Sequence, residues 1–197
     1  RILEDLDFIV ARYQPESIRF MDDNFFIDQT RITEFIREYK KRGFKFKWTA
    51  FGRCNFFANL SEEILRDLKA VGLKQVFFGV ESGSQRILDK VDKKIKVADV
   101  LITLGKIKKQ DILGDFTFIN GFPNEKKSDV YASLKLRNLI KKISPRSSVR
   151  FFAYTPLPGT AMLVECEALG YQKPSKIEDW ESYEFHSFRA PWLSSGY

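Results

Sequence analysis

The chain has 197 residues, of which 44% are hydrophobic and 15% aromatic, enough for one sizeable hydrophobic core. No apolar run approaches the roughly 20 residues of a membrane-spanning helix. The two cysteines, Cys54 and Cys166, are too few for a disulfide framework, so we expect free thiols in a reducing cytoplasm. The formal net charge is +7, but short basic groups such as Lys93-Lys94 lack interleaved aromatics. That pattern is typical of solvated helix faces and makes a nucleic-acid surface the less favoured interpretation.

Stretches with helical periodicity alternate with short apolar runs along the first 170 residues. The helices are expected at 1–13, 32–43, 61–72, from 87, at 97–107 and at 130–143, with Ser61 as a helix start. The apolar runs expected to be strands are 18–21, 44–50, 76–81, 115–119 and 149–154. Because each strand follows a helix at the spacing of βα units, we predict an α/β fold, a partial (β/α) TIM-type barrel with a mainly parallel sheet and outer helices.

The regular pattern fades after Gly170. We therefore divide the chain into a core, residues 1–170, and an aromatic tail, residues 171–197, that packs on an open part of the sheet. His186, the only histidine, lies in this tail, and a surface or packing role is favoured over catalysis. The aromatic residues of the tail are Tyr171, Trp180, Tyr183, Phe185, Phe188 and Trp192.

Polar residues follow each predicted strand where its apolar run stops. In an α/β barrel the carboxyl ends of the strands share one rim, which carries the active site. Glu81 ends the most apolar strand, and we expect Glu81 and Ser82 to project into a cavity; the alternative is that Glu81 only caps the following helix. The rim has no histidine and no glycine-rich phosphate loop, which argues against acid–base or nucleophilic catalysis by side chains alone. The polar residues at the strand ends are Asp22, Asp23, Asn24, Arg53, Asn55, Glu81, Ser82, Asn120, Gly121, Tyr154 and Thr155.

Four segments in chain order resemble successive motifs of one enzyme family. They are Phe20-Met-Asp-Asp-Asn-Phe, Phe78-Gly-Val-Glu-Ser-Gly-Ser, Phe118-Ile-Asn-Gly-Phe-Pro-Asn-Glu and Thr155-Pro-Leu-Pro-Gly-Thr. Together they resemble radical S-adenosylmethionine (SAM) enzymes over nearly the whole chain. The most similar branch includes anaerobic magnesium-protoporphyrin IX monomethyl ester cyclase and cobalamin-dependent methyltransferases.

The resemblance implies a role for each strand end. Residues 22–24 would meet the methionyl amine of SAM, and Arg53 could pair with its carboxylate. Glu81 would accept hydrogen bonds from the ribose hydroxyls with Ser82 close by, the backbone of residues 119–121 would face adenine, and residues 154–157 would form the last wall. The cofactor-binding residues implied in this way are Asp22, Asp23, Asn24, Arg53, Glu81, Ser82, Ile119, Asn120, Gly121, Tyr154 and Leu157.

The CxxxCxxC loop that defines the family is absent, and two distant cysteines cannot replace it. In the family that loop follows the first barrel strand, so the resemblance implies a fragment without that strand, itself inactive and with no metal ligands. The parent enzyme would use SAM, a four-iron four-sulfur cluster and a reductant protein on a small-molecule substrate, for oxidative cyclisation or methyl transfer. The resemblance also allows cobalamin on another domain.

Two other function classes stay open. A metal-dependent hydrolase or aldolase could use Asp22, Asp23 and Glu81 as ligands, and a non-catalytic domain could bind RNA through its positive charge. The missing first strand also predicts an exposed edge at Ile18–Met21, which would be covered by the aromatic tail, a second copy of the chain or another part of the parent enzyme.

Overall fold

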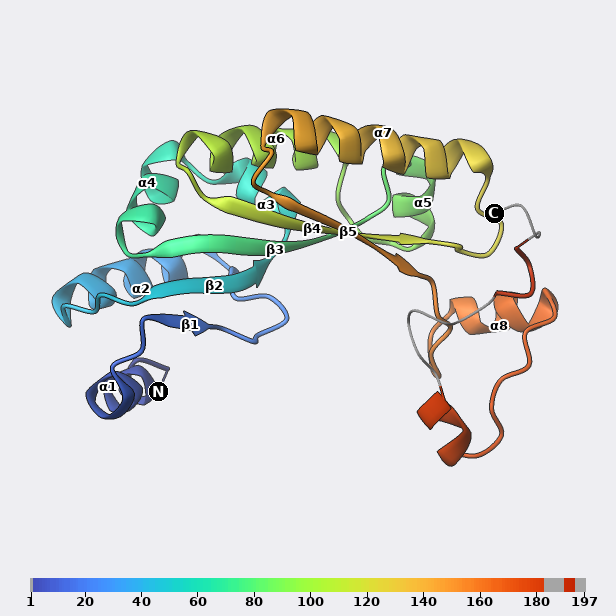
Figure 1. Cartoon of the computed structure of the whole chain (residues 1–197), viewed down its shortest axis with the longest axis horizontal. Helices are drawn as coiled ribbons and strands as arrows, with labels where there is room; N and C mark the ends of the chain where they lie inside the picture. Colours follow the sequence, from blue (N-terminus) through green and yellow to red (C-terminus); the bar gives the residue numbers. More distant parts are fainter. Residues whose placement is uncertain (1, 183–189, 194–197) are drawn as a thin grey trace.

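A computed structural model describes residues 2–182 and 190–193 of the chain (Figure 1). Five parallel strands form one sheet in which spatial order follows sequence order. The predicted architecture is confirmed, because the sheet is half of a TIM-type barrel with helices in the crossovers. The strands are β1 (Ser17–Arg19), β2 (Lys47–Gly52), β3 (Leu73–Glu81), β4 (Leu113–Asn120) and β5 (Ser148–Ala153). The helices are α1 (Ile2–Tyr13), α2 (Gln29–Lys41), α3 (Cys54–Asn59), α4 (Glu62–Ala70), α5 (Gln85–Lys90), α6 (Val97–Lys109), α7 (Lys127–Ile143), α8 (Met162–Ala168) and the 3-10 helix η1 (Glu178–Ser182).

Two of the α-helices, α3 and α8, were not predicted, and both lack the usual starting signal. The residue before α3 is Arg53 and the residue before α8 is Ala161, and neither side chain caps its helix. The helix start expected at Ser61 is confirmed, since its hydroxyl accepts a hydrogen bond from the Ile64 amide at 3.2 Å. Strand β2 begins later than predicted because Phe46 packs against Tyr39 before the chain enters the sheet.

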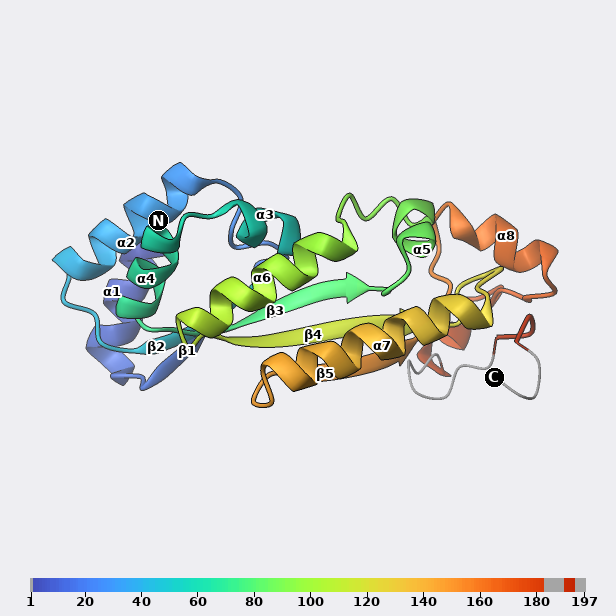
Figure 2. The same cartoon turned by 90° about the horizontal axis from the view of Figure 1, so that it is seen from above.

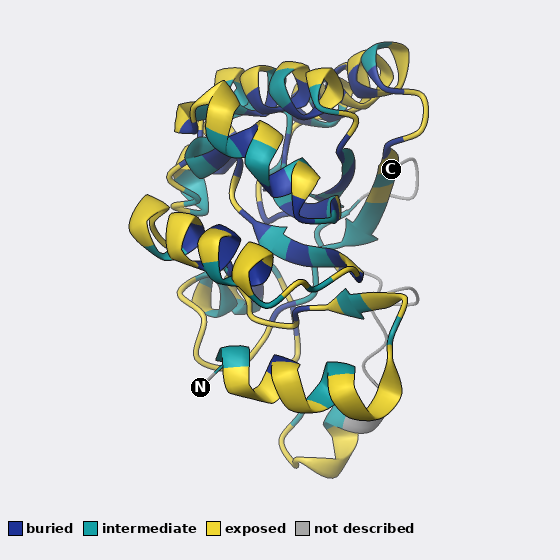
Figure 3. Cartoon of the chain, turned by 90° about the vertical axis from the view of Figure 1, so that its left-hand side faces the viewer, coloured by how far each residue is buried: buried dark blue, intermediate teal, exposed yellow. Residues whose placement is uncertain are grey.

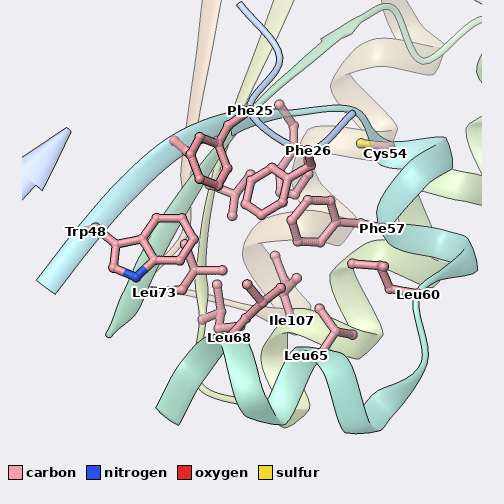
Figure 4. Packing of buried hydrophobic residues seen from close by; sticks show 14 of the residues in the cluster. Phe25, Phe26, Trp48, Cys54, Phe57, Leu60, Leu65, Leu68, Leu73 and Ile107 are labelled. Atoms are coloured by element: carbon pink, nitrogen blue, oxygen red, sulfur yellow. The ribbon is translucent and has the colours of Figure 1, made fainter. Parts of the chain in front are cut away.

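The convex face of the sheet is apolar and covered by helices. Figure 2 shows α6 and α7 lying over the strands, and Figure 3 shows the helices buried on the side that faces the sheet. Trp48, Phe78 and Phe116 are fully buried on this face. Figure 4 shows the same core close up, with Phe57 of α3 and Leu65 of α4 packed beside the strands. This continuous apolar layer is the main source of stability.

Residues of the concave face alternate with residues of the convex face along each strand. The concave face is partly open. Phe51 and Phe77 pair across β2 and β3 with ring centroids 5.0 Å apart, and the Arg19 guanidinium lies 4.8 Å from the Phe77 ring. Further along the sheet this face carries Thr117 and Arg150. Polar groups and aromatic rings therefore line the side that holds the cavities.

Strand β1 forms one edge of the sheet. No strand among the described residues pairs with its outer side, so the expected exposed edge is present, and what covers it stays a prediction. The described end of the tail lies at the other side of the sheet, where Trp192 Nε1 donates to the Gly121 carbonyl at 2.9 Å. The tail residues Tyr183, Phe185, His186 and Phe188 lie outside the described residues. None of the helices described is both long and apolar enough to span a membrane.

Candidate functional site

The acidic turn after β1 is held in place by aromatic residues on both sides. Phe20 and Phe25 are buried with ring centroids 4.6 Å apart, and the Phe25 amide donates to the Phe51 carbonyl at the end of β2. Between them, Asp23 and Asn24 line a cavity of about 520 Å³ on the concave face. We call it the central cavity. It is also lined by Phe51, Gly52, Arg53, Phe77, Phe78, Gly79, Val91, Asp92, Lys93, Thr117 and Arg150.

A second cavity of about 410 Å³, the lateral cavity, lies at the ends of β4 and β5. Thr117 lines both cavities, so they adjoin across one residue of β4. The lateral cavity has mainly apolar walls. It is lined by Glu81, Thr117, Ile119, Phe152, Ala153, Tyr154, Thr155, Leu157 and Thr160.

The predicted rim is therefore present, because residues from all five strand ends meet at one end of the sheet. Asp23, Asn24 and Arg53 reach the central cavity, whereas Glu81, Ile119, Tyr154 and Leu157 reach the lateral cavity. Asp22 is exposed and lines neither cavity.

Glu81 is the most constrained of these residues. The pairing of β3 with β4 shifts register between Gly79 and Glu81, and Glu81 has a φ of +68°, a left-handed conformation that is uncommon outside glycine. Its Oε1 accepts from Lys93 Nζ at 2.5 Å. Gly79 leaves the space, because a Cβ there would lie 2.7 Å from that oxygen. Glu81 thus faces a cation, not the next helix, and the interpretation as a helix cap is wrong.

Lys93 was not predicted as a site residue. Lys93-Lys94 was interpreted as part of a solvated helix face, but both residues lie in the loop between α5 and α6, and Lys93 lines the central cavity. Two side chains at the end of β2 fix this loop: Arg53 Nη2 donates to the Lys93 carbonyl at 2.5 Å and Asn55 Nδ2 to the Lys94 carbonyl at 3.2 Å. Nothing in the local sequence distinguishes Lys93 from its neighbour.

The expectation that Ser82 projects into a cavity is wrong. Ser82 is fully buried, and its hydroxyl lies 3.3 Å from the Ser133 hydroxyl of α7. The Gly83 amide donates to the same Ser133 oxygen at 2.8 Å, and Ser84 Oγ donates to Asp129 Oδ1 at 2.5 Å. The three residues after Glu81 therefore attach the end of β3 to α7.

Two asparagines at the strand ends have a buried side-chain oxygen with no hydrogen-bond partner in the described part of the chain, Asn24 Oδ1 and Asn120 Oδ1. Buried oxygens in this state usually accept from a water or a ligand. Gly121 is less available than predicted, because it is buried, its amide donates to Glu125 at 2.5 Å and its carbonyl accepts from Trp192.

The described residues include no group of three or more His, Cys, Asp or Glu side chains that could hold a metal ion. Asp22, Asp23 and Glu81 thus do not form the metal site that the hydrolase hypothesis needs. Cys54 and Cys166 are free and buried, and burial raises the pKa of each thiol. Inert thiols in two separate helices do not fit an iron–sulfur cluster.

Residues 1–137 match the family model of the radical SAM superfamily. An uncharacterized methyltransferase of Pyrococcus horikoshii, PH0819, is 32% identical over 162 residues, which are 82% of this chain and 34% of that protein. The cytidylyl-2-hydroxyethylphosphonate methyltransferase of Streptomyces wedmorensis is 27% identical over 93% of this chain and 34% of its own length. The chain thus spans about a third of these two curated relatives.

Solved structures show the same fold. The radical SAM methyltransferase TsrM of Kitasatospora setae, solved with cobalamin and a [4Fe-4S] cluster, superposes with a TM-score of 0.69 at 16% identity, over 85% of this chain and 33% of TsrM. The cobalamin-dependent radical SAM enzyme OxsB gives 0.62 at 20% identity, over 68% of this chain and 21% of OxsB. The family-model match covers well over half of the chain, and the chain belongs to the radical SAM superfamily.

Proposed function

We propose that this chain is the SAM-binding half-barrel of a radical SAM enzyme that transfers a methyl group to a small-molecule substrate. The observation that carries the proposal is the division of the rim into a polar central cavity and an apolar lateral cavity that adjoin at Thr117. SAM has a charged amino-acid end and a flat, largely apolar base joined by a ribose. The two cavities match that order of chemical groups.

The central cavity suits the methionyl end. Asn24 Oδ1 is a buried acceptor without a partner, and the Asp23 carboxylate lies on the same wall, so the pair can accept from an ammonium group. Arg53 and Lys93 line the same cavity and supply cations for the carboxylate. These are the donor and acceptor types that a zwitterion needs.

Glu81 lines the lateral cavity and pairs with Lys93 of the central cavity. It therefore suits the ribose, which joins the amino-acid end of SAM to the base. A carboxylate oxygen accepts hydroxyl hydrogens well, and the strained backbone of Glu81 fixes its direction. Only one oxygen of Glu81 is engaged by Lys93, so the other is available to a diol.

The lateral cavity suits adenine. Ile119 and Leu157 offer aliphatic surface, and Tyr154 offers an aromatic ring. Burial raises the pKa of Tyr154 to about 12, so its phenol is neutral at pH 7 and can stack without adding charge.

The [4Fe–4S] cluster that membership of the family implies supplies the electron for reductive cleavage of SAM when it is bound. Neither Cys54 nor Cys166 fits it, so we place its ligands outside these 197 residues. The cobalamin in OxsB and TsrM and the methyltransferase names of the curated relatives favour methyl transfer with cobalamin on another domain. The free thiols favour a cytoplasmic enzyme.

The test is calorimetric titration of the chain with S-adenosylhomocysteine and with methylthioadenosine, which lacks the amino acid. Glu81→Gln should weaken both by about 10- to 100-fold, the equivalent of 1.5–3 kcal/mol for a hydrogen bond to a charged group. Arg53→Met should weaken S-adenosylhomocysteine more than methylthioadenosine, since only the former carries the carboxylate.

Glu62→Gln is the matched control, because Glu62 also pairs with a lysine at 2.5 Å but on the helical surface. It should leave both affinities unchanged. Equal affinities in the wild type and Glu81→Gln, or no binding by a folded wild-type chain, would overturn the proposal.

A further inference from the structure

Arg150 lies on the concave face with its guanidinium held from one side. Its Nε and Nη2 donate to the two carboxylate oxygens of Asp115 at 3.1 and 2.9 Å, which makes a bidentate pair between β4 and β5. The Asp115 side chain is 9% exposed, whereas that of Arg150 is 51% exposed. The carboxylate is therefore inside the wall and the guanidinium faces outward.

This arrangement leaves one edge of the guanidinium available. Nη1 has no acceptor within hydrogen-bond distance in the part of the chain that the structure describes. Arg150 also lines the central cavity, and its guanidinium lies 5.8 Å from the Phe152 ring, which with Asp115 limits its rotation. A guanidinium fixed on one edge and free on the other is prepared to bind an oxyanion.

A second pair shows what an ordinary surface contact looks like in this protein. Arg146 and Asp111 make an ion pair of 3.0 Å at the amino end of the same two strands, with both side chains about 70% exposed. Such a pair contributes little. The Arg150 pair differs in its buried carboxylate, its two-point geometry and its place on a cavity wall.

Arg150 lies deeper than the groups assigned to the cofactor. It is in register with Thr117, and Thr117 with Gly79, so it lies below the level of Glu81. Arg150 lies three positions before the end of β5 at Ala153, which is about 10 Å along a strand. The paired rings of Phe51 and Phe77 line the same cavity and offer an apolar surface.

We propose that Arg150, positioned by Asp115, binds a carboxylate or phosphate group of the substrate, whose apolar part packs on Phe51 and Phe77. The substrate class is thus an anionic small molecule. This inference rests on the proposed function only in identifying the bound anion as the substrate of the enzyme. Oxyanion binding by Arg150 is measurable by itself. The other source of the same chemistry is the carboxylate of the cofactor.

The experiment is ¹H–¹⁵N NMR titration of the chain with sodium acetate and with inorganic phosphate, at ionic strength held constant with sodium chloride. Both anions should shift the amides of Gly79 and Thr117 in a saturable way. Arg150→Met should weaken this response at least about 10-fold, and Arg150→Lys, which keeps the charge beside Asp115 but loses the fork, at least about threefold. Arg146→Met is the matched control and should leave it unchanged.

A second arm repeats the titration with saturating S-adenosylhomocysteine. A response that persists assigns the anion to the substrate, and one that disappears assigns it to the cofactor and overturns the proposal. The proposal also fails if the wild type shows no saturable shift, or if a folded Arg150→Lys binds both anions as the wild type does. Failure of S-adenosylhomocysteine to bind, with the anion response intact, would contradict the proposed function alone.

Discussion

The two faces of the sheet differ in what their residues do. On the convex face Trp48, Val76 and Phe78 are fully buried beneath helices, and nothing polar interrupts them. On the concave face Phe51 and Phe77 alternate with those residues along the same strands and line the central cavity. Because successive side chains of a strand point to opposite faces, one run of sequence supplies both the hydrophobic core and the cavity wall. The convex face should therefore tolerate substitution least.

The largest expected effect tests that difference directly. Phe78→Ala removes a fully buried ring stacked 5.3 Å from Phe116 and should cost about 3–5 kcal/mol of unfolding free energy. Phe51→Ala on the concave face should cost less than half as much, because water can enter the space. Urea unfolding of both variants measures the difference. Equal losses would mean that the concave face is as much a part of the core as the convex one.

A smaller effect concerns the polar contacts that fix the end of β3 on the convex side. Burial by itself would raise the pKa of Asp129, but hydrogen bonds from Arg86, from Ser84 and from the Lys126 amide lower it to about 2. Folding thus favours the ionised carboxylate, so this contribution is complete above about pH 4 and is lost as the pH falls to about 2.

Asp129→Asn should therefore reduce the unfolding free energy by about 2 kcal/mol at pH 7. The difference from the wild type should shrink between pH 4 and pH 2. Denaturant unfolding at several pH values measures it, with Asp111→Asn, an exposed carboxylate paired with Lys69, as the control. A difference that does not change with pH would show that the charge of Asp129 is not what stabilises this contact.

The smallest effect is on chemical reactivity, with no change in stability. Burial raises the pKa of Cys54 in α3, on the convex side, and of Cys166 in α8, beyond β5. Neither thiol should react with iodoacetamide in the native chain at pH 8. Below the global urea midpoint, Cys166 should become reactive before Cys54, because α8 packs at the periphery and α3 in the core. Mass spectrometry measures the urea concentration at which each cysteine becomes labelled. Labelling of both cysteines at the same concentration would mean that the two regions unfold together.

Much of this arrangement could be predicted from the sequence. Apolar runs that stop at polar residues placed the strands, and the common direction of parallel strands placed Asp23, Glu81 and Ile119 at one end. The exact contacts could not be predicted, since they depend on residues far apart in the chain. Lys93 meets Glu81 across a register shift, and Ser82 meets Ser133 of α7, 51 residues away. From the sequence alone, Arg150 cannot be distinguished from a surface arginine. Its two hydrogen bonds to Asp115, which lies 35 residues away, appear only in the structure.

The residues after Glu81 have a further consequence for the study of divergence. Gly83 lies so close to α7 that a Cβ would fall 2.5 Å from the Ala132 carbonyl, and Ser82 is buried against the same helix. A side chain at position 83 would push β3 and α7 apart whether or not the protein binds a nucleoside. A descendant that had abandoned its chemistry should therefore keep a small residue at 82 and glycine at 83, yet be free to change Glu81. Searches for inactive paralogues should weigh position 81 separately from the rest of the motif.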